Sequence, residues 1–233
     1  MKRRLNPVLM AALIGAAVGA ILTGRLKLRG LRLPEGNQWY SGDDKLIAHW
    51  PFLLVSVLAW SLLSIYREAA AKKASAAKSS ESQSSRGVHV FLVNAAMLLV
   101  LIPIRGWGRF EPALPAIMAA GLAIQALGIL LAVWARVHLG RNWSGAISIK
   151  VEHQLVRSGP YRLLRHPIYT GLLTMYLGTA LTTGEWHAAL GVALAVFAYW
   201  RKIRLEEATM DTAFGAAYET YRRSTWALIP GMF

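Results

Sequence analysis

The stretch ALPAIMAAGLAIQALGILLAVWA, residues 113–135, decides the class of the fold because none of its 23 side chains is charged. A helix that crosses the hydrocarbon core of a bilayer needs about 20 mostly apolar residues. The stretch meets that length and is followed at once by the charged Arg136. It therefore predicts a membrane-spanning helix over about Ala113–Ala135.

Working outward from this stretch, five further apolar runs predict spans. They are Pro7–Thr23, Leu46–Tyr66, Val88–Ile104, Ile168–Thr183 and His187–Trp200. The last two are short for spans, and only a brief turn separates them, so we expect a C-terminal helical hairpin that is tilted or lies partly within the protein. The expected fold class is an all-α integral membrane protein with about six transmembrane helices.

The first apolar run allows a second interpretation. Lys2, Arg3 and Arg4 precede it, as in the basic start of a cleaved signal peptide. Its length, and the lack of a clear small-x-small cleavage site after it, favour a span that is retained in the protein.

The composition agrees with a membrane protein. Hydrophobic residues make up 55% of the chain and charged residues 16%, whereas ordinary soluble domains carry about 25% charge. The net charge of +14 could indicate nucleic-acid binding. However, the basic residues lie between the hydrophobic runs, where they set membrane topology, so we expect no nucleic acid. The chain has no cysteine, which excludes disulfides, thiolate metal sites and cysteine nucleophiles.

Three basic segments predict the orientation. They are the segments 67–87, 136–165 and 201–223. The first is rich in Ala, Ser and Lys and is expected to be a flexible connector. With six spans and a basic N-terminus inside, all three lie on the cytoplasmic side. The basic loop after the first span, which contains Arg25 and Arg32, does not fit this orientation.

Two polar segments flank the predicted hairpin, namely Gly140–Gly171 and Arg201–Tyr221. A two-helix hairpin brings its ends together, so these segments should meet and form a ligand site at the cytoplasmic surface. The apolar residues of the second segment predict one amphipathic helix, because they recur at spacings of four, four and three. These residues are Met210, Phe214, Tyr218 and Tyr221.

Individual side chains leave two interpretations open. Pro167 fits the first position of a helix. The exposed N–H groups of this helix start, near His166, could hold a carboxylate, or the His-Pro pair could begin the helix without binding anything. Lys202 and Glu206 lie four residues apart, either as a surface ion pair or as a functional pair at the end of a hydrophobic helix.

Five short motifs follow one another in the last two-fifths of the chain. They are H-x-L-V at 153–156, G-x-Y at 159–161, R-H-P-x-Y-x-G at 165–171, E-E at 206–207 and F-G-x-x-Y-x-x-Y at 214–221. In this order they resemble the isoprenylcysteine carboxyl methyltransferase family, in its prokaryotic form. The resemblance covers roughly Leu139–Pro230.

The resemblance implies a set of site residues. Those that would bind the cofactor are His153, Gln154, Leu155, Val156, Tyr161, His166, Pro167, Ile168, Tyr169 and Glu207. Lys202 and Glu206 would be catalytic. The family often has arginine where this chain has Lys202, and lysine cannot make the two-pronged bond of arginine to a carboxylate.

The activity implied is methyl transfer from S-adenosylmethionine to a carboxylate of a lipophilic, isoprenoid-like acceptor. The implied partners are a lipid or lipophilic small molecule and the membrane lipids, with the active site facing the cytoplasm and no metal. A first alternative is a phospholipid amine N-methyltransferase, in which Glu206 or Glu207 would act as base. A second is a membrane reductase that uses a nicotinamide cofactor, and a third is a bundle without enzymatic activity.

These expectations divide the chain in two. Residues 1–136 would form the N-terminal transmembrane part with four spans, and residues 137–233 the methyltransferase core. The N-terminal part shows none of the five motifs, so selection of the acceptor could reside there.

Overall fold

The computed structural model describes residues 50–71, 77–102, 115–143, 147–150 and 154–231. Two units are distinguished by their internal contacts, residues 1–69 and residues 70–233. The first expected span, Pro7–Thr23, lies outside the described residues. The expected boundary at residue 136 falls inside a helix of the second unit.

Helix α2, Trp50–Ala71, belongs for most of its length to the first unit. Its apolar part, Phe52–Arg67, corresponds to the expected span Leu46–Tyr66. The helix continues beyond that span to Ala71, into the segment expected to be a connector. Alanine favours helix more than any other residue, and three alanines stand at 69–71.

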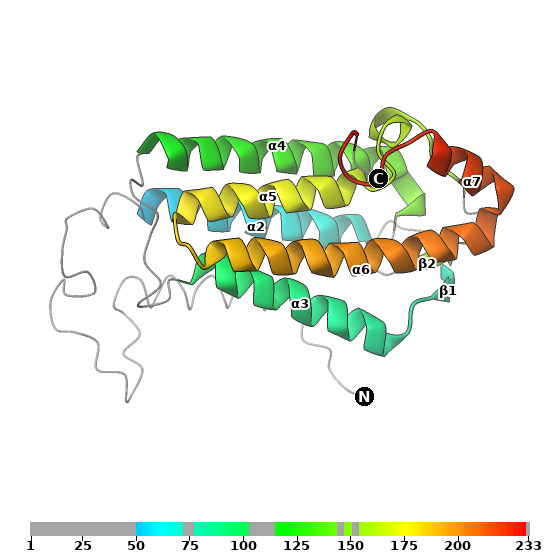
Figure 1. Cartoon of the computed structure of the whole chain (residues 1–233), viewed down its shortest axis with the longest axis horizontal. Coiled ribbons are helices and arrows are strands. Elements are labelled where there is room, and N and C mark those ends of the chain that lie inside the picture. The colour runs from blue at the N-terminus through cyan, green and yellow to red at the C-terminus, as the bar shows by residue number, and fades with distance from the viewer. Residues whose placement is uncertain (1–49, 72–76, 103–114, 144–146, 151–153, 232–233) are drawn as a thin grey trace, which may run out of the picture. The chain divides into compact units, whose positions relative to one another are not determined.

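The second unit is built from five helices within its described residues. These are α3 (Gln83–Leu101), α4 (Pro115–Leu139), α5 (Pro167–Thr183), α6 (Ala188–Phe214) and α7 (Ala216–Arg223). Figure 1 shows α4, α5 and α6 side by side, with α3 along α6. The unit is all-helical except for one small ribbon, in which β1 (Ala77–Ser80) pairs antiparallel with β2 (Ser148–Lys150). The expected all-α class is confirmed by this architecture and corrected only at the ribbon.

Helix α5 is the centre of the second unit. It contacts α3, α4 and α6, and ten of its 17 residues are buried. Against α4 it packs through glycines, since a Cβ placed at Gly128 would lie 2.5 Å from the Gly171 carbonyl oxygen. A buried hydrogen bond of 3.1 Å from Gln125 Nε2 to Thr179 Oγ1 crosses the same interface. Close backbone approach of this kind is typical of helices that associate within a membrane.

Two sequence-based expectations were wrong. The segment 67–87 is not one flexible connector, because it holds the end of α2, the strand β1 and the start of α3. The charged helical stretch expected after Trp200 is continuous with the apolar one, so α6 runs on to Phe214. The expected single amphipathic helix is broken at Gly215, whose φ of 51° places Met210 and Phe214 on α6 and Tyr218 and Tyr221 on α7.

Two helices of the described residues have the length and composition to cross a membrane. They are Gln83–Leu101 and Ala116–Leu139. Phe52–Arg67 is apolar but shorter, and α5 has only 17 residues. The count of six spans therefore stays a prediction.

The glycine contact between α4 and α5 gives a test of the fold. In Gly128→Ala the new methyl group would overlap the Gly171 carbonyl oxygen, so we expect a loss of about 1–3 kcal/mol of stability. Thermal unfolding in detergent measures it. Gly87→Ala on α3 is the matched control, since no atom lies within 4 Å of its added methyl group. Equal unfolding midpoints for the two variants would show that the close approach is absent.

Candidate functional site

The two polar segments meet where α5 begins. His166 is the residue that precedes the first turn of α5, and Glu206 and Glu207 lie in the charged half of α6. His166 Nε2 lies 3.2 Å from Glu207 Oε1, and His166 Nδ1 lies 3.6 Å from Glu206 Oε2. The imidazole, whose exposed fraction is 7%, is therefore held between two neighbouring carboxylates. We call His166, Glu206 and Glu207 the carboxylate–histidine cluster.

Burial and pairing compete in setting the charges of this cluster. Burial disfavours the imidazolium form, but the pairing of His166 with the carboxylates of Glu206 and Glu207 outweighs this effect, so the pKa of His166 is raised. Burial would likewise raise the pKa of Glu206, but His166 and Lys202 reverse this and lower it. The pKa of Glu207 falls to about 2, because His166 and Arg165 outweigh its burial. Both carboxylates are therefore ionised at neutral pH.

Aromatic rings and a buried cation line one side of the cluster. The Tyr169 ring stacks on the His166 ring, with the centroids 5.6 Å apart and the planes 9° from parallel, and Tyr199 of α6 lies 5.2 Å further on. Lys202 is buried, with Nζ 5.9 Å from the centroid of Tyr169. Rings that face a cation in a dry environment stabilise positive charge. This wall of the site can accept a cationic group.

The end of α7 and the chain that follows it fasten the run that leads into α5. We call residues 222–228 the C-terminal strap. Its carbonyl groups at Trp226 and Ala227 accept hydrogen bonds of 2.7 and 3.1 Å from the backbone N–H groups of Arg165 and His166. The Thr170 hydroxyl donates to the Leu228 carbonyl at 2.8 Å. The strap thereby fixes the backbone from which His166 projects.

Arg165 links the strap to the cluster. Its Nε donates to Glu207 Oε1 at 2.8 Å, and one terminal nitrogen donates to the carbonyls of Arg222 and Thr225. The side chain is 6% exposed. Arg165 was not among the predicted site residues, although it directly precedes His166. The signal that could have found it is its position in a motif next to the first turn of a helix.

The strap also changes the picture of the helix start. The sequence suggested that N–H groups near His166 could hold a carboxylate, yet the N–H groups of Arg165 and His166 are bonded to the strap. Pro167 has no N–H, and the N–H of Tyr169 donates to the His166 carbonyl at 3.0 Å. A carboxylate bound here therefore depends more on cationic side chains than on the helix start.

The other predicted residues fall in several places. Tyr161 is buried in the short turn η3 (Gly159–Arg162), and its carbonyl accepts a hydrogen bond of 2.7 Å from the Tyr221 hydroxyl. Gln154 is exposed, Leu155 and Val156 are half-buried, and Ile168 is half-buried beside the buried Pro167. His153 lies outside the described residues. Arg157, which follows Val156, donates to the Ala217 carbonyl at 2.7 Å and so ties this segment to α7.

Arg201, which begins the second polar segment, makes a contact outside the cluster. Its guanidinium donates to the Ser85 hydroxyl at 2.9 Å, and the Ser85 hydroxyl donates to Glu81 Oε1 at 2.6 Å. This chain of bonds attaches α6 to the start of α3. The three basic segments expected to share one side of the membrane are thus in contact, through β1 with β2 and through Ser85 with Arg201.

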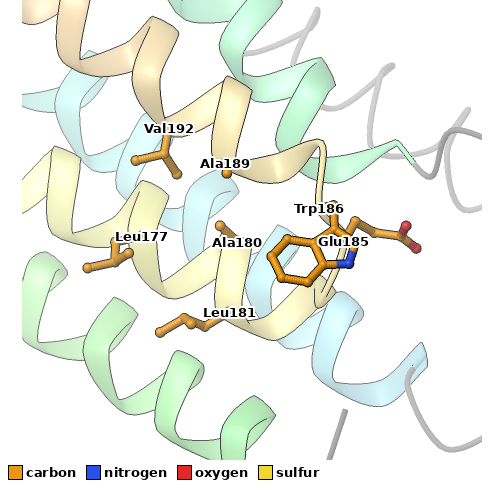
Figure 2. A pocket seen from close by; sticks show the side chains of 7 residues that line it. All are labelled: Leu177, Ala180, Leu181, Glu185, Trp186, Ala189 and Val192. Atoms are coloured by element: carbon orange, nitrogen blue, oxygen red, sulfur yellow. The ribbon is translucent and has the colours of Figure 1, made fainter. Parts of the chain in front are cut away.

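A pocket of about 230 Å³ lies at the other end of the hairpin. Figure 2 shows the seven side chains that line it, Leu177, Ala180, Leu181, Glu185, Trp186, Ala189 and Val192. The carboxylate of Glu185 extends away from the apolar side chains. Since an α-helix rises about 1.5 Å per residue, Leu177, the nearest of these residues in the chain, is about 17 Å along α5 from His166. The pocket does not belong to the carboxylate–histidine cluster.

Comparison with known proteins shows what the matched region is similar to. A family model described as phospholipid methyltransferase matches residues 116–217. The protein-S-isoprenylcysteine O-methyltransferase of Schizosaccharomyces pombe is 32% identical over 114 residues, which are 48% of each chain. The A enzyme of Arabidopsis thaliana is 32% identical over 113 residues, or 47% of this chain and 57% of that protein. This region is related to the isoprenylcysteine carboxyl methyltransferase family.

Two further similarities bear on this relationship. The structure of a eukaryotic intramembrane Ras methyltransferase, isoprenylcysteine carboxyl methyltransferase, superimposes with a TM-score of 0.52 at 18% identity, over 78% of this chain and 68% of that chain. At this identity the likeness concerns the fold. The cobalt-zinc-cadmium resistance protein CzcN of Cupriavidus metallidurans is 35% identical over 111 residues. The chain spans about half the length of the curated relatives it matches. The predicted family resemblance is confirmed.

The link through Arg165 gives a second test. Arg165→Gln removes the cation from the buried pair with Glu207 and breaks two bonds to the strap, so we expect about 3 kcal/mol of destabilisation. Thermal unfolding in detergent measures the change. Arg162→Gln, at an exposed position of η3, should leave the midpoint unchanged. If Arg165→Gln unfolds no earlier than Arg162→Gln, the strap does not depend on this side chain.

The raised pKa of His166 gives a third test. A group whose pKa is higher in the folded state adds stability that is complete below its unfolded pKa, about 6.5, and is lost as pH rises through the folded pKa. We therefore expect the unfolding midpoint to fall as pH is raised above about 6.5. His166→Gln cannot titrate, so this part of the decline should disappear. An identical pH dependence in wild type and His166→Gln would contradict the ion pair.

Proposed function

We propose that this protein is a membrane methyltransferase that transfers a methyl group from S-adenosylmethionine to the carboxylate of a lipophilic acceptor. The observation that carries the proposal is the meeting of His166 with Glu206 and Glu207, which brings the R-H-P and E-E motifs into one buried cluster. The relation of the matched region to isoprenylcysteine methyltransferases supports the same reaction. We propose Lys202 and Glu206 as catalytic residues, and the predicted motif residues from His153 to Tyr169 together with Glu207 as the donor site.

The charges of the described residues fit such a donor. Glu206 Oε2 is buried and accepts no hydrogen bond from another described side chain or backbone group. The ring of Tyr169 stacks on His166 of the same cluster, and the ring of Tyr199 lies beyond it. A carboxylate and aromatic rings together suit the positive sulfonium and ammonium groups of S-adenosylmethionine. When bound, this donor supplies a methyl group on a cationic sulfur, which needs no activation by the protein.

The acceptor side requires a cation in a dry environment. An acceptor carboxylate is ionised at neutral pH and attacks without a general base. Lys202, buried beside Tyr169, would orient that carboxylate as its oxygen forms the bond to the methyl carbon. The carbon–sulfur bond breaks at the same time, so the products are a methyl ester and neutral S-adenosylhomocysteine. Exclusion of water by the surrounding rings would make the carboxylate a better nucleophile.

The lowered pKa values favour a carboxylate acceptor over an amine. A protonated amine must give up a proton before it can attack, and Glu206 or Glu207 would have to accept that proton. Because the pKa of each carboxyl group is lowered, both are weak bases. Amine methylation stays the second candidate on one observation, that the matching family model is described as phospholipid methyltransferase.

Membrane placement follows from the same argument. The two helices Gln83–Leu101 and Ala116–Leu139 support an integral membrane protein. We propose that it crosses the membrane several times, with the cluster at the cytoplasmic face. The three basic segments are in contact near the charged half of α6, and basic segments usually stay on the cytoplasmic side. An isoprenoid-like acceptor would enter the cluster from the surrounding lipid.

The chemistry of the product tests the function directly. Purified protein is incubated with S-adenosylmethionine carrying a radiolabelled methyl group and with native membrane lipids, and the labelled product is treated with base. A methyl ester releases volatile methanol in base, whereas a methylated amine retains its label. Label that resists base would favour the amine, and NADPH binding without S-adenosylmethionine binding would favour a reductase.

Variants of the cluster test the site assignment. We expect His166→Ala and Glu206→Ala each to lower the rate of methyl transfer by about a thousandfold or more, since preorganised charge is the main contribution of such a site. Arg204→Ala, at an exposed position of α6 close to both, is the matched control and should keep its rate. Size-exclusion profiles in detergent monitor folding. Normal rates in both cluster variants would remove these residues from the site.

A further inference from the structure

Arg136 ends the apolar helix α4 as a buried cation. It lies in the last turn of α4 and is 7% exposed. One terminal nitrogen donates to the Gly140 carbonyl at 2.8 Å, and the guanidinium carbon lies 4.5 Å above the ring of Trp143. A contact with the last carbonyls of a helix alone would explain an arginine at the surface. It does not explain why a charge is buried.

The end of α4 lies against the predicted donor segment. Helix α4 contacts η3, and a Cβ placed at Gly159 would lie 2.2 Å from the ring of His138 on α4. Tyr161 of η3 is buried, and its surroundings shift the pKa of its hydroxyl in opposite directions. Burial raises its pKa most, the charge of Glu206 raises it further and the charge of Arg136 lowers it. Arg136 and the carboxylate–histidine cluster therefore act on one and the same buried hydroxyl.

The donor carries a carboxylate that needs a partner. The N–H groups of Arg165 and His166 are bonded to the C-terminal strap, and Arg165 is bonded to Glu207. Lys202 lies on α6 beside Tyr169, on the side proposed for the acceptor. Arg136 lies in the last turn of α4, the same turn from which His138 contacts Gly159 of η3. A guanidinium has five donors, so it can bind a carboxylate with two of them and keep its bond to Gly140.

We propose that Arg136, at the end of α4, binds the amino-acid carboxylate of the methyl donor and so belongs to the donor site. The inference rests on the proposed function and names a residue that lies outside the five motifs. In this arrangement the donor is held at its carboxylate by α4, while its positive groups face Glu206 and the rings of Tyr169 and Tyr199. Helix α4 is then part of the site, and the site is not confined to the polar segments that flank the hairpin.

The experiment compares two donors that differ only in this carboxylate. Binding of S-adenosylmethionine and of decarboxylated S-adenosylmethionine to the full chain in detergent is measured by calorimetry. We expect Arg136→Gln to weaken binding of S-adenosylmethionine about tenfold to a hundredfold. Binding of the decarboxylated donor should change less than about threefold. Arg136→Lys keeps the charge but lacks the paired N–H donors of a guanidinium. It should show a smaller loss of affinity, and that loss should still be selective for the donor that carries the carboxylate.

Controls separate this inference from a structural role and from the proposed function. Arg162→Gln, exposed in the neighbouring turn, should bind both donors like wild type. Equal weakening of both donors by Arg136→Lys would mean that Arg136 only holds the end of α4, and would overturn the inference. The inference is overturned as well if Lys202→Met, and not the Arg136 variants, discriminates between the donors. If wild type binds neither donor, the proposed function itself fails.

Discussion

A buried imidazole between two adjacent carboxylates is the constraint on which the second unit depends. His166 comes from the start of α5 and Glu206 and Glu207 come from the middle of α6, so their contacts fix how far along each other these two helices lie. An ion pair away from water keeps its members together, because separating them would leave an uncompensated charge. The strap, the rings of Tyr169 and Tyr199 and the cation of Lys202 are arranged around this fixed point.

The glycine contacts between α4 and α5 complement this constraint from the apolar side. Gly121 and Gly128 on α4 face Gly178 and Gly171 on α5, seven residues apart on each helix, which corresponds to two helical turns. Helices in a lipid environment gain little from burying apolar side chains against one another, so close backbone packing determines how they associate. The α4–α5 pair brings Arg136, η3 and the start of α5 to the same end of the unit.

The sequence predicted the helices of this region well because their signals are local. The apolar run 113–135 and the proline at 167 mark α4 and the start of α5 correctly. One further element depended on a contact between distant residues. Strand β1 exists because it pairs with β2, some 70 residues later, and no pattern within Ala77–Ser80 indicates a strand. The continuation of α6 past Trp200 reflects strong helix formers such as Leu205, Glu206 and Glu207, which outweigh the change from apolar to charged.

The residues of the candidate site likewise differ in how far the sequence alone could predict them. His166, Glu206 and Glu207 were recognisable from motifs, and Arg165 stands in one of these motifs although its bonds to the strap were not predicted. Arg136 lies outside the motifs, and its meaning comes only from what surrounds it in the fold. Basic residues at the end of a hydrophobic run usually mark the membrane boundary. Only burial distinguishes Arg136 from that common role, and burial is a property of the folded chain.

Helix α6 runs without interruption from Ala188 to Phe214, so one rigid rod of about 40 Å contains both an apolar half and the charged half that holds Lys202 and Glu206. If the thickness of the bilayer tilts the apolar half, the charged half therefore tilts with it. Because His166 holds α5 to Glu206 and Glu207 of α6, lipids with shorter or longer chains would tilt the two helices together. The thickness of the bilayer would thus set the orientation of the proposed site relative to the membrane surface.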